Sequence, residues 1–106
     1  MRAGVVALTL AAVAAMAGPA SAEAAGPYCP RGMFCVWKGA DFTGRMYGSD
    51  QAQRCWSGIT AGMSMANEMT HAVTAFEFSD CTGANFTLEP GFDTANAPFP
   101  IYSVRT

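Results

Sequence analysis

Short runs that alternate between apolar and polar residues, separated by Gly, Asp, Asn and Ser, make up most of the chain beyond residue 30. Residues 73–78 (VTAFEF) and residues 85–91 (NFTLEPG) are the clearest of these runs. A period of two residues is typical of half-buried antiparallel strands, whose side chains point alternately to the two faces of a sheet. The residues predicted to face inward are Phe76, Phe78, Phe86 and Leu88, and those predicted to face outward are Glu77 and Thr87.

Residues 34–37 (FCVW) and 45–47 (RMY) also favour strands, and the bend between them is polar. No stretch repeats its apolar residues with a period of 3.6 over the length that a helix needs. In the connection that follows, Gly58 and Gly62 oppose a stable helix, while residues 66–71 are compatible with one short helical turn. The pattern therefore predicts an all-β fold.

An internal repeat links two of these regions. Trp37 is followed by Gly44 after seven positions, and Phe76 is followed by Gly83 at the same spacing. Each glycine is followed, three positions later, by another aromatic residue, so the two copies superpose with a constant offset of 39 residues. Two copies in register indicate a duplicated unit.

The repeated spacing predicts a folded-over hairpin corner in each copy. Glycine adopts a positive φ without strain, which suits Gly44 and Gly83 to a sharp turn. We expect the preceding aromatic residue, Trp37 or Phe76, to pack on the exposed backbone of the turn and hold it closed. The alternative is a core aromatic residue that merely precedes a glycine. Neither interpretation gives the corner a catalytic role.

The N-terminal segment has the layout of a secretory signal peptide. Arg2 precedes an uncharged apolar run, and Pro19 precedes a small-residue cleavage pattern that ends at Ala22. Cleavage after Ala22 is the prediction, with a cut after Ala24 or a retained anchor helix as alternatives. No other stretch approaches the roughly 18 apolar residues that span a bilayer, so we expect a secreted chain without a membrane span. The predicted segments are a signal peptide (1–22), a flexible leader (23–28) and one folded domain (29–106).

Residues 23–106 contain five basic and eight acidic residues, which gives this part of the chain a net charge of −3. The basic residues are scattered singly, so nothing predicts a track for phosphates, and nucleic acid is not expected as a partner. A domain of this size buries a modest fraction of its surface and often needs covalent support.

Four cysteines in an exported chain predict two disulfides, for which three pairings are possible. Pro30 and Gly32 can bend the chain between the first two cysteines so that their sulfur atoms meet. A bridge between the other two closes a longer loop and contributes about 3 to 4 kcal/mol in the loop-entropy account. Zinc is not favoured, because the spacing is wrong and His71 is the only histidine. The favoured pairs are Cys29–Cys35 and Cys55–Cys81.

The sequence does not predict an enzyme. A single histidine in a Met-rich segment is more typical of a packing or surface residue than of a catalytic base. Oxidised cysteines cannot act as nucleophiles. Glu77 and Glu89 are better explained as outward strand or turn residues than as the carboxylate pair of a glycosidase.

The start of the domain carries a specific constellation of motifs: a C-P-x-G-x-x-C clamp, an aromatic residue, an acidic-aromatic bend and a Gly-basic pair. These positions are Cys29, Pro30, Gly32, Cys35, Trp37, Asp41, Phe42, Gly44 and Arg45. They resemble the exported bacterial peptidase inhibitors with a βγ-crystallin-like fold, of the Streptomyces metalloproteinase inhibitor type. Residues 66–73 (ANEMTHAV) and 86–91 (FTLEPG) are similar to later motifs of that family, so the resemblance covers most of residues 28–91.

The resemblance implies a two-Greek-key β-sandwich, with motif one at about 29–70 and motif two at about 71–106. It also implies a secreted, monomeric inhibitor of metallopeptidases whose partner is an extracellular peptidase. Related βγ-crystallin-like secreted proteins are cell-killing toxins or calcium binders, so fold alone does not decide the function. Two alternatives therefore stand: a binding or toxin module with a secreted or cell-surface target such as the cell wall, and a calcium-stabilised structural protein.

The calcium-binding relatives carry a paired Asn/Asp, two residues and then Ser/Thr-Ser. The corresponding stretch here begins with Ala66 and ends with His71, which loses two of the expected positions. Oxygen ligands remain at Asn67, Glu68 and Thr70, fewer than the six to eight that calcium takes. We therefore predict no cofactor, with calcium at these three residues as the alternative.

An inhibitor needs a rigid, exposed loop that stays in the cleft of the peptidase. The candidate is the bend 79–85 (SDCTGAN), with Asp80, Cys81, Thr82 and Gly83 at its centre. A disulfide would tether the loop, and the glycine would provide the turn. Thr82 is a poor match for thermolysin-like enzymes, which prefer a bulky apolar residue after the cut bond. The alternative is an ordinary disulfide-braced hairpin turn.

Replacing Gly44 by Val is expected to lower the free energy of unfolding by more than an ordinary surface substitution does. The reason is that a β-branched residue is strained at the positive φ predicted for this corner. Chemical denaturation measures the loss, and unchanged stability would refute the corner.

Overall fold

The computed structural model describes residues 28–106, so the predicted signal peptide and nearly all of the predicted leader lie outside the described residues. This part of the chain contains strands, turns and bends and no helix, which confirms the predicted all-β class. The strands are β1 (Phe34–Gly39), β2 (Thr43–Ser49), β3 (Cys55–Trp56), β4 (Ser64–Asn67), β5 (Val73–Phe76), β6 (Asn85–Leu88), β7 (Asp93–Thr94) and β8 (Ser103–Arg105).

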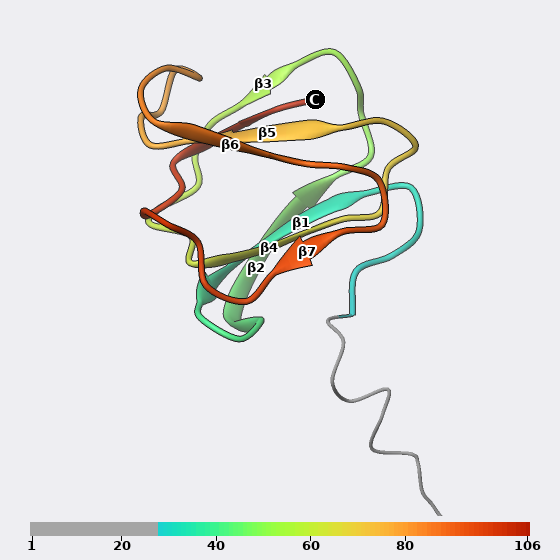
Figure 1. Cartoon of the computed structure of the whole chain (residues 1–106), viewed down its shortest axis with the longest axis horizontal. Helices are drawn as coiled ribbons and strands as arrows, with labels where there is room; N and C mark the ends of the chain where they lie inside the picture. The colour runs from blue at the N-terminus through green and yellow to red at the C-terminus, as the bar shows by residue number, and fades with distance from the viewer. Residues whose placement is uncertain (1–27) are drawn as a thin grey trace, which may run out of the picture.

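The strands form two four-stranded antiparallel sheets, with the orders β2-β1-β4-β7 and β3-β8-β5-β6 (Figure 1). Each sheet takes three strands from one half of the chain and the third strand of the other half, β7 or β3. Each fourth strand returns beside the first strand of its half, as in a Greek key. This order is consistent with the predicted two-Greek-key sandwich.

The core lies between the sheets and is built from the inward-facing residues of both. Its fully buried side chains include Phe34, Val36, Met65, Val73, Ile101 and Val104. A second, smaller cluster of Cys35, Trp37 and Ala66 lies on the outer face of the first sheet. The disulfide between Cys29 and Cys35, with Cα atoms 5.9 Å apart, helps to cover this cluster.

The offset of 39 residues extends through the whole domain, because it also relates β1 to β5, β2 to β6 and β4 to β8. Gly62 and Ile101 are counterparts at this offset, and they bond to each other: each N–H donates to the carbonyl of the other at 2.8 Å. A symmetric contact between two equivalent residues places the pseudo-twofold axis of the domain between them. Gly62 is required there, because a Cβ at this position would lie 2.3 Å from Cγ1 of Val36.

The two corners share positive φ values at two equivalent positions, and the first corner has a third at Asp41, with a φ of 58°. Gly44 has a φ of +81° and Gly83 a φ of +92°, as a sharp glycine turn requires. Two residues earlier, Phe42 and Cys81 also have positive φ values, 59° and 60°. Non-glycine residues adopt this region at a cost, so each corner needs support from the surrounding structure.

A buried serine supplies that support in each half. The N–H of Phe42 donates to Oγ of Ser64 at 3.0 Å, and the Ser64 hydroxyl donates to the carbonyl of Gly39 at 2.7 Å. In the second half, the N–H of Cys81 donates to Oγ of Ser103 at 2.9 Å, and the Ser103 hydroxyl donates to the carbonyl oxygen 25 residues earlier. Both serines are fully buried, so their hydroxyl groups take the place of solvent for the bent backbone.

The predicted helical turn at 66–71 is wrong. Strand β4 continues to Asn67, and the side chain of this residue then organises the bend that follows. Its Oδ1 accepts the N–H of Met69 at 2.8 Å, and its Nδ2 donates to the carbonyls of His71 and Leu88 at 2.9 Å. A buried asparagine that bonds the backbone two residues ahead favours a turn over a helix.

The inward face predicted for 73–78 is also wrong. Strand β5 ends at Phe76, and its buried residues are Val73 and Ala75, so Phe76 is only half-buried. Phe78 belongs to the corner and is 54% exposed. The prediction for β6 is confirmed: Leu88 and the half-buried Phe86 pack on the core, and Thr87 is exposed.

Replacing Ser64 by Ala is expected to lower the free energy of unfolding by about 2 kcal/mol, because it leaves the partly buried N–H of Phe42 and carbonyl of Gly39 without their partner. Urea denaturation measures the change. Ser57→Ala is the matched control, since Ser57 is exposed. Equal losses for the two variants would refute the supporting role of Ser64.

Candidate functional site

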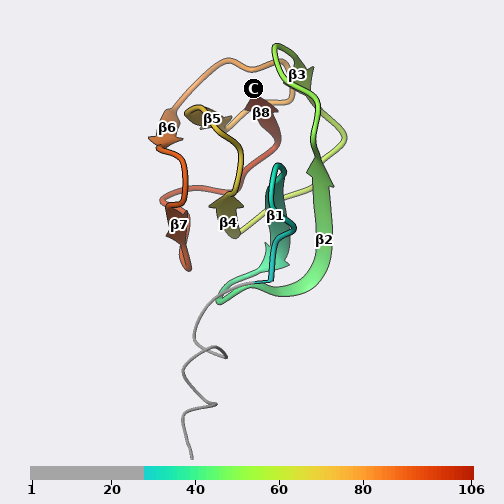
Figure 2. The same cartoon turned by 90° about the vertical axis from the view of Figure 1, so that its right-hand side faces the viewer.

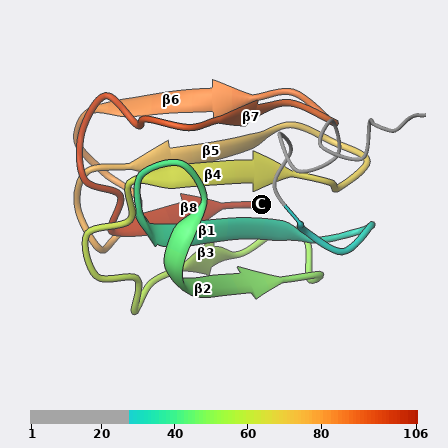
Figure 3. The same cartoon turned by 90° about the horizontal axis from the view of Figure 1, so that it is seen from below.

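The second corner is the most distinctive exposed loop of the domain. It spans residues 77–84 between β5 and β6, and β1 and β5 run in the same direction, so both corners lie at the same end of the sandwich (Figure 3). The candidate residues Asp80, Thr82 and Gly83 are exposed at its tip. Cys81, between them, is only 8% exposed, so the tip presents side chains on either side of a buried anchor.

Two bonds hold Cys81 against the second sheet. Its sulfur atom is joined to Cys55 of β3, with Cα atoms 6.1 Å apart, and its N–H donates to Ser103 of β8. Strands β3 and β8 are themselves paired, with Cys55 opposite Arg105. The loop is thus anchored to two neighbouring strands, and both disulfides join the pairs that the sequence favours.

Hydrogen bonds within the loop keep it compact. The N–H of Glu77 donates to the carbonyl of Ala84 at 2.9 Å, and the N–H of Ala84 donates to the Glu77 carboxylate at 3.2 Å. The N–H of Phe78 donates to the carbonyl of Thr82 at 3.2 Å. The hydroxyl of Thr82 also donates to the carboxylate of Asp80. The loop is therefore folded on itself and does not have the extended form of a flexible substrate.

An exposed aromatic ring lies over the turn. A Cβ built at Gly83 would lie 2.6 Å from Cδ2 of Phe78, so the ring packs directly on the glycine. The sequence predicts this packing for Phe76, but the residue that provides it is Phe78. Because the ring remains 54% exposed, the corner presents one bulky apolar side chain beside its polar tip.

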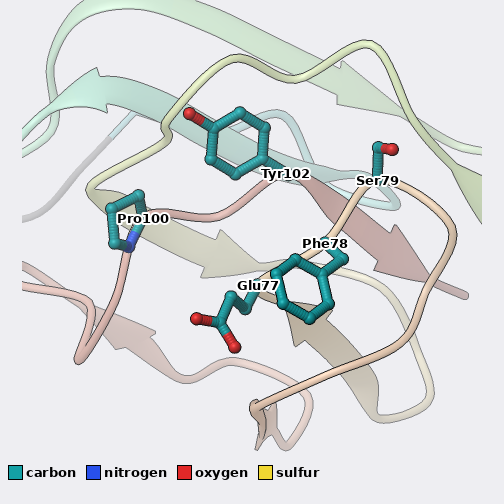
Figure 4. A pocket seen from close by; sticks show the side chains of 5 residues that line it. All are labelled: Glu77, Phe78, Ser79, Pro100 and Tyr102. Carbon is teal, nitrogen blue, oxygen red and sulfur yellow. The ribbon is translucent and has the colours of Figure 1, made fainter.

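Phe78 also forms one side of an open hollow of about 400 Å³. Figure 4 shows Phe78 and Ser79 of the loop facing Tyr102 and Pro100 of the segment that enters β8, with the Glu77 carboxylate at the rim. No motif in the sequence predicts a role for the C-terminal segment. The offset of 39 residues is the sequence signal for this segment, because it makes Tyr102 the counterpart of Met63. The N–H of Tyr102 donates to the backbone carbonyl of Phe76, and that of Met63 donates to the backbone carbonyl of Trp37. Each therefore bonds the aromatic residue that opens the corner of its half.

The first corner is closed differently. Both corners have the sequence D-x-T-G, but Phe42 occupies the position that Cys81 has in the second corner. The ring of Phe42 meets Trp37 edge-on, with centroids 5.2 Å apart, and Trp37 is 6% exposed. The N–H of Asp41 donates to the carbonyl of Ala95 at 2.9 Å. Aromatic packing here replaces the disulfide of the second corner.

The residues considered for calcium do not favour a site. The only side-chain oxygen of Asn67 accepts the N–H of Met69, and the residue is fully buried. Thr70 is exposed and Glu68 is half-buried on the following bend. Across residues 28–106 there is no group of three or more His, Cys, Asp or Glu side chains that could hold a metal ion.

The family model of Peptidase inhibitor family I36 matches residues 22–88 of the chain. The matched region includes both corners, both disulfides and the strands β1 to β6. No curated protein matches the chain. Within the residues described by the structure, no helix is long and apolar enough to cross a membrane.

Removal of the second disulfide, by Cys55→Ala together with Cys81→Ala, is expected to cost about 3.5 kcal/mol of unfolding free energy in the loop-entropy account. It is also expected to make residues 79–83 the first site cut by an added peptidase, because one anchor of the loop is gone. Urea denaturation and mass spectrometry of the fragments measure the two effects.

The matched control is Cys29→Ala with Cys35→Ala, which removes a shorter loop closure worth about 2 kcal/mol. This variant keeps both anchors of Cys81 and should be cut elsewhere first. First cleavage within 79–83 in both variants, or in neither, would contradict the anchoring role of the Cys55–Cys81 bond.

Proposed function

The chain belongs to peptidase inhibitor family I36, and from this premise we propose that it is a secreted inhibitor of metallopeptidases that acts through its second corner. As a member of an inhibitor family, the protein is not itself an enzyme. In this proposal the mature protein is residues 23–106, a monomer of two motifs (about 29–70 and 71–106) that meets its peptidase outside the cell. The loop 79–83 enters the cleft, and the adjoining ring of Phe78 is bound beside it.

The observation that carries this proposal is the double anchoring of Cys81. An inhibitor gains affinity when its binding loop needs no further ordering, because the entropy cost of binding is then small. The disulfide to Cys55 and the hydrogen bond to Ser103 provide this order without covering Asp80 or Thr82. A loop anchored at its centre also stays in place when a peptidase strains it.

The compact form of the loop supports inhibition over cleavage. Peptidases act on chains that extend along their clefts, and extension of this loop would break the hydrogen bonds from Glu77 to Ala84 and from Phe78 to Thr82. It would also move Cys81 away from the serine that stabilises its positive φ. The peptidase would therefore hold the loop without reaching a productive geometry.

The choice of metallopeptidases rests on the family resemblance and on Phe78. Thermolysin-like enzymes prefer bulky apolar side chains, and Thr82 does not provide one. Phe78 lies at the same corner, is more than half exposed and packs on Gly83, so its position is fixed relative to the tip. An apolar subsite of the peptidase can take this ring, and large aromatic side chains held in this way often dominate the binding energy of an interface.

The test is a titration of purified residues 23–106 against a panel of metallo-, serine and cysteine peptidases. The expected result is inhibition of a thermolysin-like metallopeptidase with a stoichiometry of one to one. Absence of inhibition across the panel would refute the function, and inhibition of serine or cysteine peptidases alone would refute the target class.

In the same assay, Phe78→Ala is expected to raise the inhibition constant about thirtyfold. This corresponds to about 2 kcal/mol for the loss of an aromatic side chain that becomes buried in the complex with the peptidase. The matched control is Phe92→Ala, because Phe92 is 64% exposed on the turn between β6 and β7. Equal inhibition by the two variants would show that the second corner is not the inhibitory loop.

A further inference from the structure

A second hollow, of about 330 Å³, lies on a different part of the molecule, where the two sheets open between their edge strands β2 and β3. Figure 2 shows these two strands on the same side of the sandwich, one in each sheet. Met46 and Tyr47 of β2 line it on one side and Trp56 of β3 on the other, above the core residues Phe34 and Ile59. Its floor is therefore apolar.

Three cations contact residues that line this hollow or lie next to its lining. The guanidinium of Arg45 lies 5.7 Å from the ring centre of Tyr47, and that of Arg54 lies 4.9 Å from the ring centre of Trp56. The ammonium of Lys38 donates to the carbonyl of Thr60 at 3.0 Å, and the hydroxyl of Thr60 bonds the phenol of Tyr47 at 3.0 Å. Arginines that rest on aromatic rings are held in position while their N–H groups stay available.

The contacts of these cations are with neutral groups: a carbonyl, two aromatic rings and, for Arg54, the amide of Gln51 at 2.9 Å. Two of these charges also act on Tyr47, which lines the hollow. The hydrogen bond from Thr60 and then the positive charges of Arg45 and Lys38 hold the pKa of Tyr47 below its usual value. A positive hollow on a chain with a net charge of −2 is suited to an anionic ligand.

One wall of the hollow is a free sheet edge. Strand β2 is terminal in the order β2-β1-β4-β7, so within residues 28–106 no strand lies beside its outer edge, which is seven residues long. Such an edge offers backbone N–H and C=O groups to an added strand. The apolar floor and the free edge together favour a polypeptide over an anionic saccharide, and the guanidinium groups already cover the ring faces on which a sugar would stack.

We propose that this hollow binds an extended acidic peptide segment of a partner protein, as a strand added to β2. One apolar side chain of the segment enters the hollow, and carboxylates on either side of it pair with Arg45 and Arg54. The inference stands on its own observations and does not depend on the second corner or on peptidase inhibition.

The probe is an acetylated, amidated heptapeptide with Leu at its centre, Val on either side and two acidic residues at each end. The control peptide carries Asn and Gln in place of the acids. Binding is followed through tryptophan fluorescence and amide NMR shifts. The expected result is shifts centred on β2 and β3, at least tenfold weaker binding of the neutral peptide, and loss of binding when the central amide is N-methylated.

The double variant Arg45→Gln, Arg54→Gln is expected to bind the acidic peptide at least tenfold more weakly. Arg31→Gln, an exposed arginine elsewhere on the surface, should bind as the unchanged protein does. The proposal is overturned by equal binding of the two peptides, by an unaffected double variant, or by shifts that lie elsewhere. It is also overturned by the absence of binding at about millimolar peptide, or by an oligogalacturonate that displaces the peptide at equal concentration.

Discussion

Two buried hydroxyl groups hold the bent parts of this small domain. Ser64 and Ser103 each join a carbonyl and an N–H three residues apart, across the point where a strand folds back on itself. The first corner contains three residues with positive φ and the second contains two, and only one residue of each set is a glycine. A backbone in this state persists only where its surroundings fix it. The hairpins β1–β2 and β5–β6, and with them three strands of each sheet, depend on this fixing. An amide or carbonyl left without a partner at this place would lower the free energy of unfolding by a large fraction of its total in so small a domain.

The same support serves different ends in the two halves. In the first half, Phe42 packs against Trp37 and closes the corner, so both aromatic rings take part in this internal contact. In the second half, a cysteine at the same position ties the corner to β3, and the aromatic ring of Phe78 is left at the surface. The counterpart of Phe78 in the first corner is Gly39, so the second corner presents an exposed apolar side chain that the first corner lacks. The positive hollow between β2 and β3 shares no lining residue with the hollow beside Phe78 and offers a surface of different character.

The alternation of residues and the glycine spacing are local signals, which is why they predict the all-β class and both corners. The alternation predicts an inward Phe78 because it continues past Phe76. The strand ends at Phe76 and the chain turns there, and no residue of the run 73–78 marks that end. The supporting serines lie 22 residues beyond the amides they bind, and serine is too common to be noticed alone. Extension of the 39-residue offset to Ser64 and Ser103 would have found them. The exchange of β3 and β7 between the sheets, and the arginines that converge on the hollow, depend on tertiary packing that no local pattern encodes.

The contact between Gly62 and Ile101 has a consequence for the origin of the fold. A residue that bonds its own equivalent across a twofold axis would form the same bond in a pair of identical chains. A single motif, half the length of this domain, could therefore have assembled as a symmetric homodimer that exchanged its third strand. Fusion of two such chains removes the dependence of assembly on concentration. It also lifts the demand that both sides be identical, so that one side can be Ile, buried in the core, while the other is Gly, where a Cβ would meet Val36.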